Sequence, residues 1–233
     1  RSSAASDVYK RQILPRPVPF SVVYEDDDIL VVDKPADTPI HPSIGNYKNT
    51  LANGIAWYFE QKGEPFVYRC INRLDRDTTG LIVLAKHALS AAVLSQAMRS
   101  REIHRTYQAF ALGETAASGT IDAPIARLNG SLIQRTVDFA SGERSVTHYR
   151  TLAHCSVFSH LELNLETGRT HQIRVHMAYI GHPLLGDTLY NKTPGTFPRQ
   201  ALHSASLSFV HPITGEPLNF HAPLPEDMQN LLT

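Results

Sequence analysis

Apolar and polar residues alternate in several segments of the chain, which is the pattern of strands with one buried face. Residues 161–166 show it most cleanly, because leucine and polar residues alternate there without interruption. The uninterrupted apolar run at 81–85, which follows turn-forming Thr79 and Gly80, predicts a strand buried on both faces. The strands predicted from these patterns are residues 22–24, 29–33, 81–85, 105–112, 119–127, 132–139, 146–152, 158–165, 201–210 and 218–221.

Three segments have the spacing of amphipathic helices instead. Thr50 is placed to cap a helix over residues 51–61, and a second helix is predicted over 88–98. A third begins after Thr170, its predicted cap, and ends at Gly181. Many strands, few helices and no regular βαβ alternation predict an α+β fold, with a mixed, largely antiparallel sheet flanked by helices and loops.

The first twelve residues, RSSAASDVYKRQ, do not continue this pattern. They resemble a translated sequencing adapter, so we expect residues 1–12 to be non-native and exclude them from the fold. The Pro-rich segment that follows predicts an extended arm. We expect residues 13–233 to form one catalytic domain, and too few residues precede Val22 to encode an additional RNA-binding domain of the S4 type.

Composition narrows the class of protein without assigning a function. No apolar run approaches the ~20 residues that a membrane-spanning helix needs, and the start of the chain lacks a signal-peptide core. We therefore expect a cytoplasmic protein without membrane contact. The 22 basic and 22 acidic residues balance, so any affinity for nucleic acid must come from local charge. Two cysteines, Cys70 and Cys155, form neither a disulfide framework nor a zinc site.

The most informative stretch is CINRLDRDTTGLIVLAK, residues 70–86. Asp75 lies between Arg73 and Arg76, and on a strand Arg73 and Asp75 would project from the same face. A neighbouring positive charge favours an ionised carboxylate. Such a carboxylate can serve as a nucleophile, as a base or as half of a structural ion pair, and the stretch alone leaves these alternatives open.

A second basic segment follows the predicted helix 88–98 and includes Arg99, Arg101 and Arg105. Its charges either complement the helix dipole or contact phosphate groups. Tyr107 lies on the next predicted strand, where a tyrosine is usually part of the core. These observations do not decide between a structural and a functional role.

Taken together, five segments resemble the RluA-type family of RNA pseudouridine synthases. The resemblance spans residues 22–225 and keeps the order of the family's motifs. The segments are VVDKPADTPIHPS, INRLDRDTTGLIVLAK, HRTYQAFALG, TGRTHQIRVHMAYIGHPLLGDTLY and LHSASLSFVHP.

The resemblance implies roles for residues at matching positions. Asp75 would be the catalytic aspartate, and Arg73 would take the place of the base that leaves the RNA stack. Tyr107 would pack on that base and take part in proton removal. Arg174 would pair with Asp75, and Ile173 would form the apolar wall beside it. We expect Arg76 and Arg105 to contact the substrate as well.

Four positions depart from the family's usual pattern. Asn72 replaces the usual histidine before Arg-Leu-Asp, and Arg105 replaces a lysine with retention of charge. Asp37 replaces a glycine, and Thr79 precedes Gly80 where serine is commoner. None of these changes removes an expected catalytic group, although Asn72 alters the local hydrogen bonding.

The implied reaction converts specific uridines of structured RNA into pseudouridine, with 23S rRNA the first expectation and tRNA the second. The reaction breaks the glycosidic bond, rotates uracil and rejoins it through carbon, and the resemblance implies no cofactor, no metal and a monomer. It needs a nucleophilic carboxylate and a base taken out of its stack.

Three other functions are weighed against it. They are a catalytically silent RNA-binding domain, a metal-dependent hydrolase that uses some of the twelve histidines, and a cysteine hydrolase that uses Cys70. His171 and His176 lie five apart, and no established metal motif surrounds them. The sequence does not decide which RNA or uridine is modified, or whether the aspartate attacks ribose or uracil.

Overall fold

A computed structural model describes residues 13–43, 45–155 and 157–232 of the chain. The segment 1–12 lies outside the described residues, so its non-native origin stays a prediction. Eleven strands are assigned within the described part of the chain: β1 (Ser21–Glu25), β2 (Ile29–Lys34), β3 (Thr79–Ala85), β4 (His104–Leu112), β5 (Ser118–Asp122), β6 (Ile125–Arg127), β7 (Arg135–Val137), β8 (Val146–His154), β9 (Phe158–Leu165), β10 (Leu202–Val210) and β11 (Pro217–His221).

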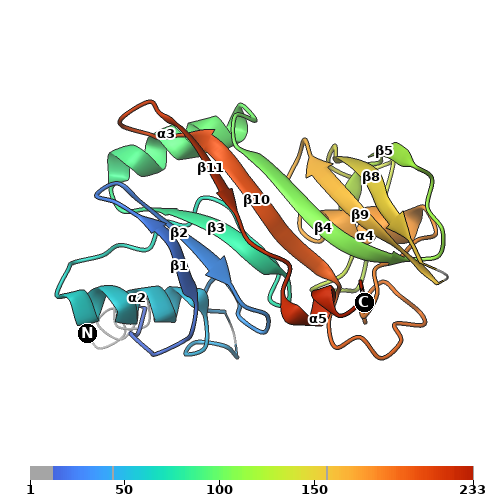
Figure 1. The fold of residues 1–233 in the computed structure, drawn as a ribbon, viewed down its shortest axis with the longest axis horizontal. Helices are drawn as coiled ribbons and strands as arrows, with labels where there is room; N and C mark the ends of the chain where they lie inside the picture. Colours follow the sequence, from blue (N-terminus) through green and yellow to red (C-terminus); the bar gives the residue numbers. More distant parts are fainter. Residues whose placement is uncertain (1–12, 44, 156, 233) are drawn as a thin grey trace.

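Nine of these strands form one sheet that runs the length of the molecule (Figure 1). Its order is β1-β2-β3-β10-β4-β9-β8-β5, with β11 paired to β10, and β6 and β7 form a separate hairpin. All recorded pairs are antiparallel except β10 with β3. The predicted fold class, α+β with a mixed and largely antiparallel sheet, is confirmed.

The helices cover both faces of the sheet, as the strand pattern requires. They are α2 (Leu51–Lys62), α3 (Ala88–Arg99), α4 (Gln172–Tyr179) and the short α5 (Glu226–Gln229). In β2, Leu30 and Val32 pack with α2 and α4 in one apolar cluster, whereas Ile29 and Val31 pack with Leu94 of α3 in another. Alternation along a strand therefore separates two cores, and α2 and α3 lie on opposite sides of β1–β3 (Figure 1).

The cap predicted for the first helix is present. Thr50 accepts a hydrogen bond from the backbone N–H of Asn53, and the Asn53 side chain accepts one from the backbone of Thr50. Gly63 ends the helix in the left-handed conformation. For α4 the prediction was wrong, because the residue before the helix is His171 and not Thr170.

The structure also corrects the predicted strand and turn around Asp75. Residues 73–75 belong to an irregular loop, and Thr79 and Gly80 begin β3 instead of ending a strand. Gly80 has a φ of 111° and pairs with Ser204 of β10. A Cβ at this position would collide with the carbonyl oxygen of Ser204, so glycine is required for the parallel pairing of β3 and β10. The contact between Gly80 and Ser204, and not the local preference for a turn, thus places residues 79–80 in a strand.

The segment predicted as one strand over 119–127 is divided in two. β5 ends at Asp122 and β6 begins at Ile125, because Pro124 lacks the N–H that a continuous ladder needs. The other predicted strands lie within one or two residues of their expected bounds, apart from β7, which is only three residues long. Within the described chain, no helix combines the length and apolarity needed to cross a bilayer.

Candidate active site

The loop that carries Asp75 is tied to β3 by the side chain of Asn72. The Asn72 amide donates to the carbonyl oxygen of Leu81 at 3.1 Å, and its oxygen accepts from the N–H of Val83 at 2.9 Å. The residue is buried and both ends of its side chain are bonded. The exchange of the family's usual histidine for Asn72 therefore leaves this loop anchored.

A buried lysine holds the same loop from behind. Lys34 ends β2, is fully buried, and donates to the carbonyl oxygens of Pro35 at 2.7 Å and Arg76 at 2.8 Å. Burial lowers the pKa of Lys34 to about 7, although the charges of Asp77 and Asp75 act in the opposite direction. Lys34 thus fixes the backbone one residue beyond Asp75.

Asp75 meets Arg174 of α4, ninety-nine positions away in sequence. Nη1 of Arg174 lies 2.9 Å from Oδ2 of Asp75. Nε and Nη2 of the same guanidinium donate to the two oxygens of Asp187 at 2.7 and 2.9 Å. Burial disfavours the charge on Arg174, but the hydrogen bonds and charges of Asp187 and Asp75 outweigh it and raise its pKa. The arrangement is an Asp–Arg–Asp chain with only its Asp75 end partly exposed.

His171 and Tyr190 complete the surroundings of this ion pair. Nε2 of His171 lies 3.8 Å from Oδ2 of Asp75, and Nδ1 lies 2.7 Å from the hydroxyl of Tyr190. The Tyr190 ring also lies over the guanidinium of Arg174, 5.1 Å from its central carbon. Within the described chain no hydrogen bond reaches Oδ1 of Asp75.

Asp75 lies in the wall of a cleft of about 730 Å³. Tyr107 of β4 lines this cleft and is otherwise buried. A smaller adjoining pocket is lined by Asp75, Tyr107 and Ile173 together with Arg174. The structure therefore brings together four of the side chains that the resemblance selected: a carboxylate, its guanidinium, an aromatic ring and an apolar wall.

Arginines line the cleft and the groove beside it. Arg73 and Arg169 border both hollows, so they lie where the two meet. Nε of Arg105 is buried with no hydrogen-bond partner in the described part of the chain. The cleft is lined by Arg73, Arg99, Arg101, Arg105 and Arg169, and the groove of about 530 Å³ by Arg73, Arg127, Arg135 and Arg169.

Arg76 is the exception among the selected residues. Its side chain is 61% exposed and faces Asp37 and Asp77, and it is not among the residues that line the cleft. Its contribution to the loop is the carbonyl oxygen that accepts from Lys34.

Comparison with known proteins agrees with this geometry. Residues 28–179 match the family described as RNA pseudouridylate synthase. An RNA pseudouridine synthase of Bacillus subtilis, YjbO, is 44% identical over 221 residues, which cover 94% of this chain and 78% of that protein. The chain belongs to the RNA pseudouridylate synthase family. The predicted resemblance is confirmed, and the protein is an isomerase that acts on RNA.

Two further relatives define the range of similarity within this family. Ribosomal large subunit pseudouridine synthase D of Vibrio cholerae is 44% identical over 227 residues, covering 91% of this chain and 69% of that protein. The solved structure of human RNA pseudouridylate synthase domain containing 1 is 26% identical with a TM-score of 0.73, covering 89% of this chain and 84% of the other. The similarity thus extends over nearly the whole sheet.

The cysteine alternative for this pseudouridine synthase conflicts with the state of the thiol. Burial raises the pKa of Cys70 to about 12, and its Sγ donates to the carbonyl oxygen of Asn72. A thiol in that state is a poor nucleophile. His176, named in the metal alternative, has no free ring nitrogen for a metal, since its two ring nitrogens bond to Thr147 and to the carbonyl oxygen of Ala123.

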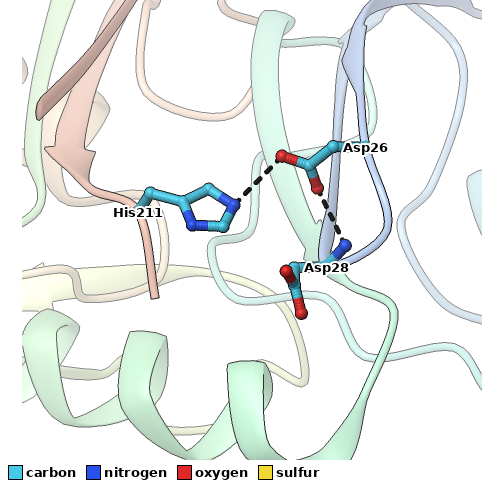
Figure 2. A group of neighbouring side chains, drawn as sticks. All are labelled: Asp26, Asp28 and His211. Atoms are coloured by element: carbon cyan, nitrogen blue, oxygen red, sulfur yellow. Dashed lines mark hydrogen bonds and ion pairs between the residues drawn. The ribbon is translucent and has the colours of Figure 1, made fainter. Parts of the chain in front are cut away.

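One other cluster has the composition of a metal site. Asp26, Asp28 and His211 are the only such group within the described ranges, and Figure 2 shows His211 and the backbone nitrogen of Asp28 both bonded to Asp26. Nδ1 of His211 accepts from the backbone N–H groups of Ile213 and Thr214, so Nε2 carries the proton and donates to Asp26 at 3.0 Å. Both ring nitrogens are engaged, and the cluster acts as a structural hydrogen-bond network.

Sequence reasoning missed three residues that support the site: Lys34, Asp187 and Tyr190. Asp187 and Tyr190 lie in a segment that carried the family resemblance. The sequence therefore showed that they belong to a family motif, but it did not show which side chains they contact. A buried aspartate needs a partner, and only the structure shows that the partner is Arg174.

Proposed function

We propose that this protein isomerises specific uridines of ribosomal RNA to pseudouridine, with Asp75 as the nucleophile. One observation carries the proposal. Asp75 lines the cleft, Arg174 holds one of its carboxylate oxygens, and the other oxygen has no hydrogen-bond donor among the described residues. A nucleophilic carboxylate needs that combination of a stabilised negative charge and an unoccupied oxygen.

The chemistry requires little from the protein beyond these groups. Attack by Asp75 on the ribose or on the uracil ring is compatible with release of uracil from its nitrogen–carbon bond. The ring then turns and rejoins the ribose through carbon, and the bond between Asp75 and the ribose or uracil breaks again, which restores the carboxylate. The hydrogen displaced from the ring carbon leaves as a proton, while the former glycosidic nitrogen gains one. No electron leaves or enters overall, so the reaction is redox-neutral.

Tyr107, Ile173 and Arg73 are proposed to hold the extruded base and fill its place. A base whose glycosidic bond is broken and remade must leave the stack. Tyr107 offers an aromatic face next to Asp75, and Ile173 offers an apolar wall. Arg73 is exposed at the junction of the cleft and the groove, where its guanidinium can enter the vacated position in the RNA.

The arginine lining supports binding of an RNA backbone. The whole chain has a formal charge of zero, yet five arginines line the cleft against two acidic residues, Asp75 and Glu166. Phosphate contacts of this kind make affinity depend on salt. The unpartnered Nε of Arg105 supports a phosphate contact at that position. The site therefore has a local excess of positive charge, although the chain as a whole is neutral.

Ribosomal RNA is preferred over tRNA because of the relatives' names. The Vibrio cholerae relative, at 44% identity, is named for the large ribosomal subunit. We also propose that the protein acts in the cytoplasm and as a monomer, as expected from the sequence.

Pseudouridine mapping of ribosomal and transfer RNA tests the proposal. Cells that lack the protein would be supplied with the wild type, with Asp75→Ala or with the matched control Asp26→Ala. We expect a site in ribosomal RNA to be restored by the wild type and by Asp26→Ala, and not by Asp75→Ala. Restoration by Asp75→Ala would overturn the nucleophile, and a restored site only in tRNA would overturn the substrate.

A further inference from the structure

His171 has a place in the site that neither the ion pair nor the base pocket explains. It precedes α4 with a φ of 59°, a left-handed conformation that is uncommon for a residue other than glycine. Its side chain is 10% exposed and lines the pocket that contains Asp75. Unusual backbone of this kind persists where surrounding contacts hold it, and it is found often at functional sites.

The hydrogen bonds of Tyr190 favour a proton on Nε2 of His171 over one on Nδ1. The Tyr190 hydroxyl accepts from the backbone N–H of Arg135 at 2.9 Å. Its own proton is then available for Nδ1 of His171, 2.7 Å away. An Nδ1 that accepts places the single proton of a neutral imidazole on Nε2. That nitrogen is the one that faces Asp75.

The surrounding charges are consistent with a neutral ring. Burial lowers the pKa of His171, and the nearby charges of Arg174 and Arg135 lower it further, whereas Asp75 and Asp187 act in the opposite direction. Burial also raises the pKa of Tyr190, which keeps the proton on its hydroxyl.

Both donors approach the same carboxylate oxygen. Nη1 of Arg174 lies 2.9 Å from Oδ2 of Asp75, and Nε2 of His171 lies 3.8 Å from the same atom. The second distance exceeds that of a hydrogen bond, but such contacts are often long in a free enzyme and shorten when substrate binds. A carboxylate held through one oxygen from two directions has its other oxygen fixed in space.

We propose that His171 is a positioning residue for Asp75, with Tyr190 holding its proton on Nε2 so that His171 and Arg174 together orient Oδ2 and leave Oδ1 to the substrate. The inference rests on the proposed role of Asp75 and adds the Tyr190–His171 pair to it. Tyr190 was not selected from the sequence, and His171 was considered there only as a metal ligand.

Two substitutions distinguish the contribution of the His171 side chain from that of its backbone conformation. Asparagine tolerates the left-handed conformation but is too short to reach Asp75, whereas glutamine can place an amide N–H near the position of Nε2. We expect His171→Asn to lower kcat by about 10²-fold, the size of effect that a displaced reacting group can produce. KM should change little, and His171→Gln should recover part of the loss. Exposed His221→Gln serves as the control.

Nitrogen NMR of the histidine rings provides a readout that does not depend on activity. The signals lost in His171→Asn identify the residue, and we expect the wild type to show the neutral Nε2–H form near pH 7.5. Tyr190→Phe should shift the proton toward Nδ1, whereas exposed Tyr179→Phe should leave it in place. A wild-type ring protonated on Nδ1, or on both nitrogens, would overturn the proposal.

The kinetic result distinguishes this inference from the proposed function. If Asp75→Asn is inactive while His171→Asn matches the wild type in kcat, the nucleophile stands and the positioning role fails. If Asp75→Asn is fully active, the proposed function fails, whatever the form of the His171 ring.

Discussion

Asp26 and Asp75 are two carboxylates with nearly the same exposure and different hydrogen bonding. Their side chains are 27% and 23% exposed, and each lies near a histidine. Asp26 accepts two backbone N–H groups on Oδ1, and the Tyr24 hydroxyl and His211 on Oδ2. Among the described residues, Asp75 accepts one close donor, Arg174, on Oδ2. Hydrogen-bonding capacity left unused, and not exposure, separates a carboxylate available for chemistry from one that stabilises a turn.

The largest effect that this comparison predicts is on the isomerisation rate. Asp75→Asn removes the proposed nucleophile and should lower kcat by more than ~10³-fold, as loss of a covalent catalytic group does elsewhere. Asp26→Asn should leave kcat within a few-fold of the wild type. Single-turnover assays on ribosomal RNA would measure both. Similar losses in the two variants would remove the functional distinction between the carboxylates.

The next effect concerns the buried support of the Asp75 site. Asp187 is fully buried and holds Arg174 through two hydrogen bonds, so Asp187→Asn should lower the free energy of unfolding by about 3 kcal/mol. Urea denaturation would measure it. Asp227→Asn is a matched control, because Asp227 holds Arg199 with the same two-bond geometry but is 32% exposed. We expect a loss of about 1 kcal/mol there, and equal losses would contradict the assigned importance of burial.

The buried Lys34 behind Asp75 predicts a pH dependence of stability. The unfolded chain keeps the lysine proton up to about pH 10.5, whereas the folded chain releases it near pH 7. Between these values the unfolded state binds more protons, so Lys34's contribution to the free energy of unfolding rises with pH, by up to about 1.4 kcal/mol per unit.

Lys34→Met should therefore reduce the rise in stability between pH 7 and 9, as measured by urea denaturation at several pH values. Exposed Lys192→Met is the control and should keep the wild-type slope. A Lys34→Met slope equal to that of the wild type would show that the folded protein does not release this proton near pH 7.

The smallest expected effect belongs to the Asp26 cluster. Burial raises the pKa of Asp26, but the N–H groups of Ile29 and Asp28 outweigh it and lower the pKa overall. Its contribution to stability is present above the ordinary aspartate value of 3.8 and is lost as the pH falls through its lower folded value. Asp26→Asn should cost about 1 kcal/mol at pH 7, less in acid, and thermal denaturation at two pH values would show whether the difference shrinks.

The sequence by itself determined most of the secondary structure and the family. Alternating leucines defined β9, and Thr50 defined the start of α2. These features depend on contacts within a few residues, which the local pattern records. The family motifs also placed Asp75 and Arg174 in the same site, although the residues that hold Arg174 did not follow from them.

Apart from the pairing of Asp75 with Arg174, which the resemblance implied, only the tertiary structure decided which side chains meet. Arg76 is adjacent to Asp75 in sequence, yet its side chain faces Asp37 and Asp77, while Arg174 arrives from α4. Position 80 of β3 must be glycine, because the backbone of Ser204 in the distant strand β10 approaches too closely for any side chain. Side-chain direction in an irregular loop, and the approach of a partner strand, depend on long-range packing that local patterns do not contain. For the same reason Lys34, Asp187, His171 and Tyr190 became part of the site only once the chain was folded.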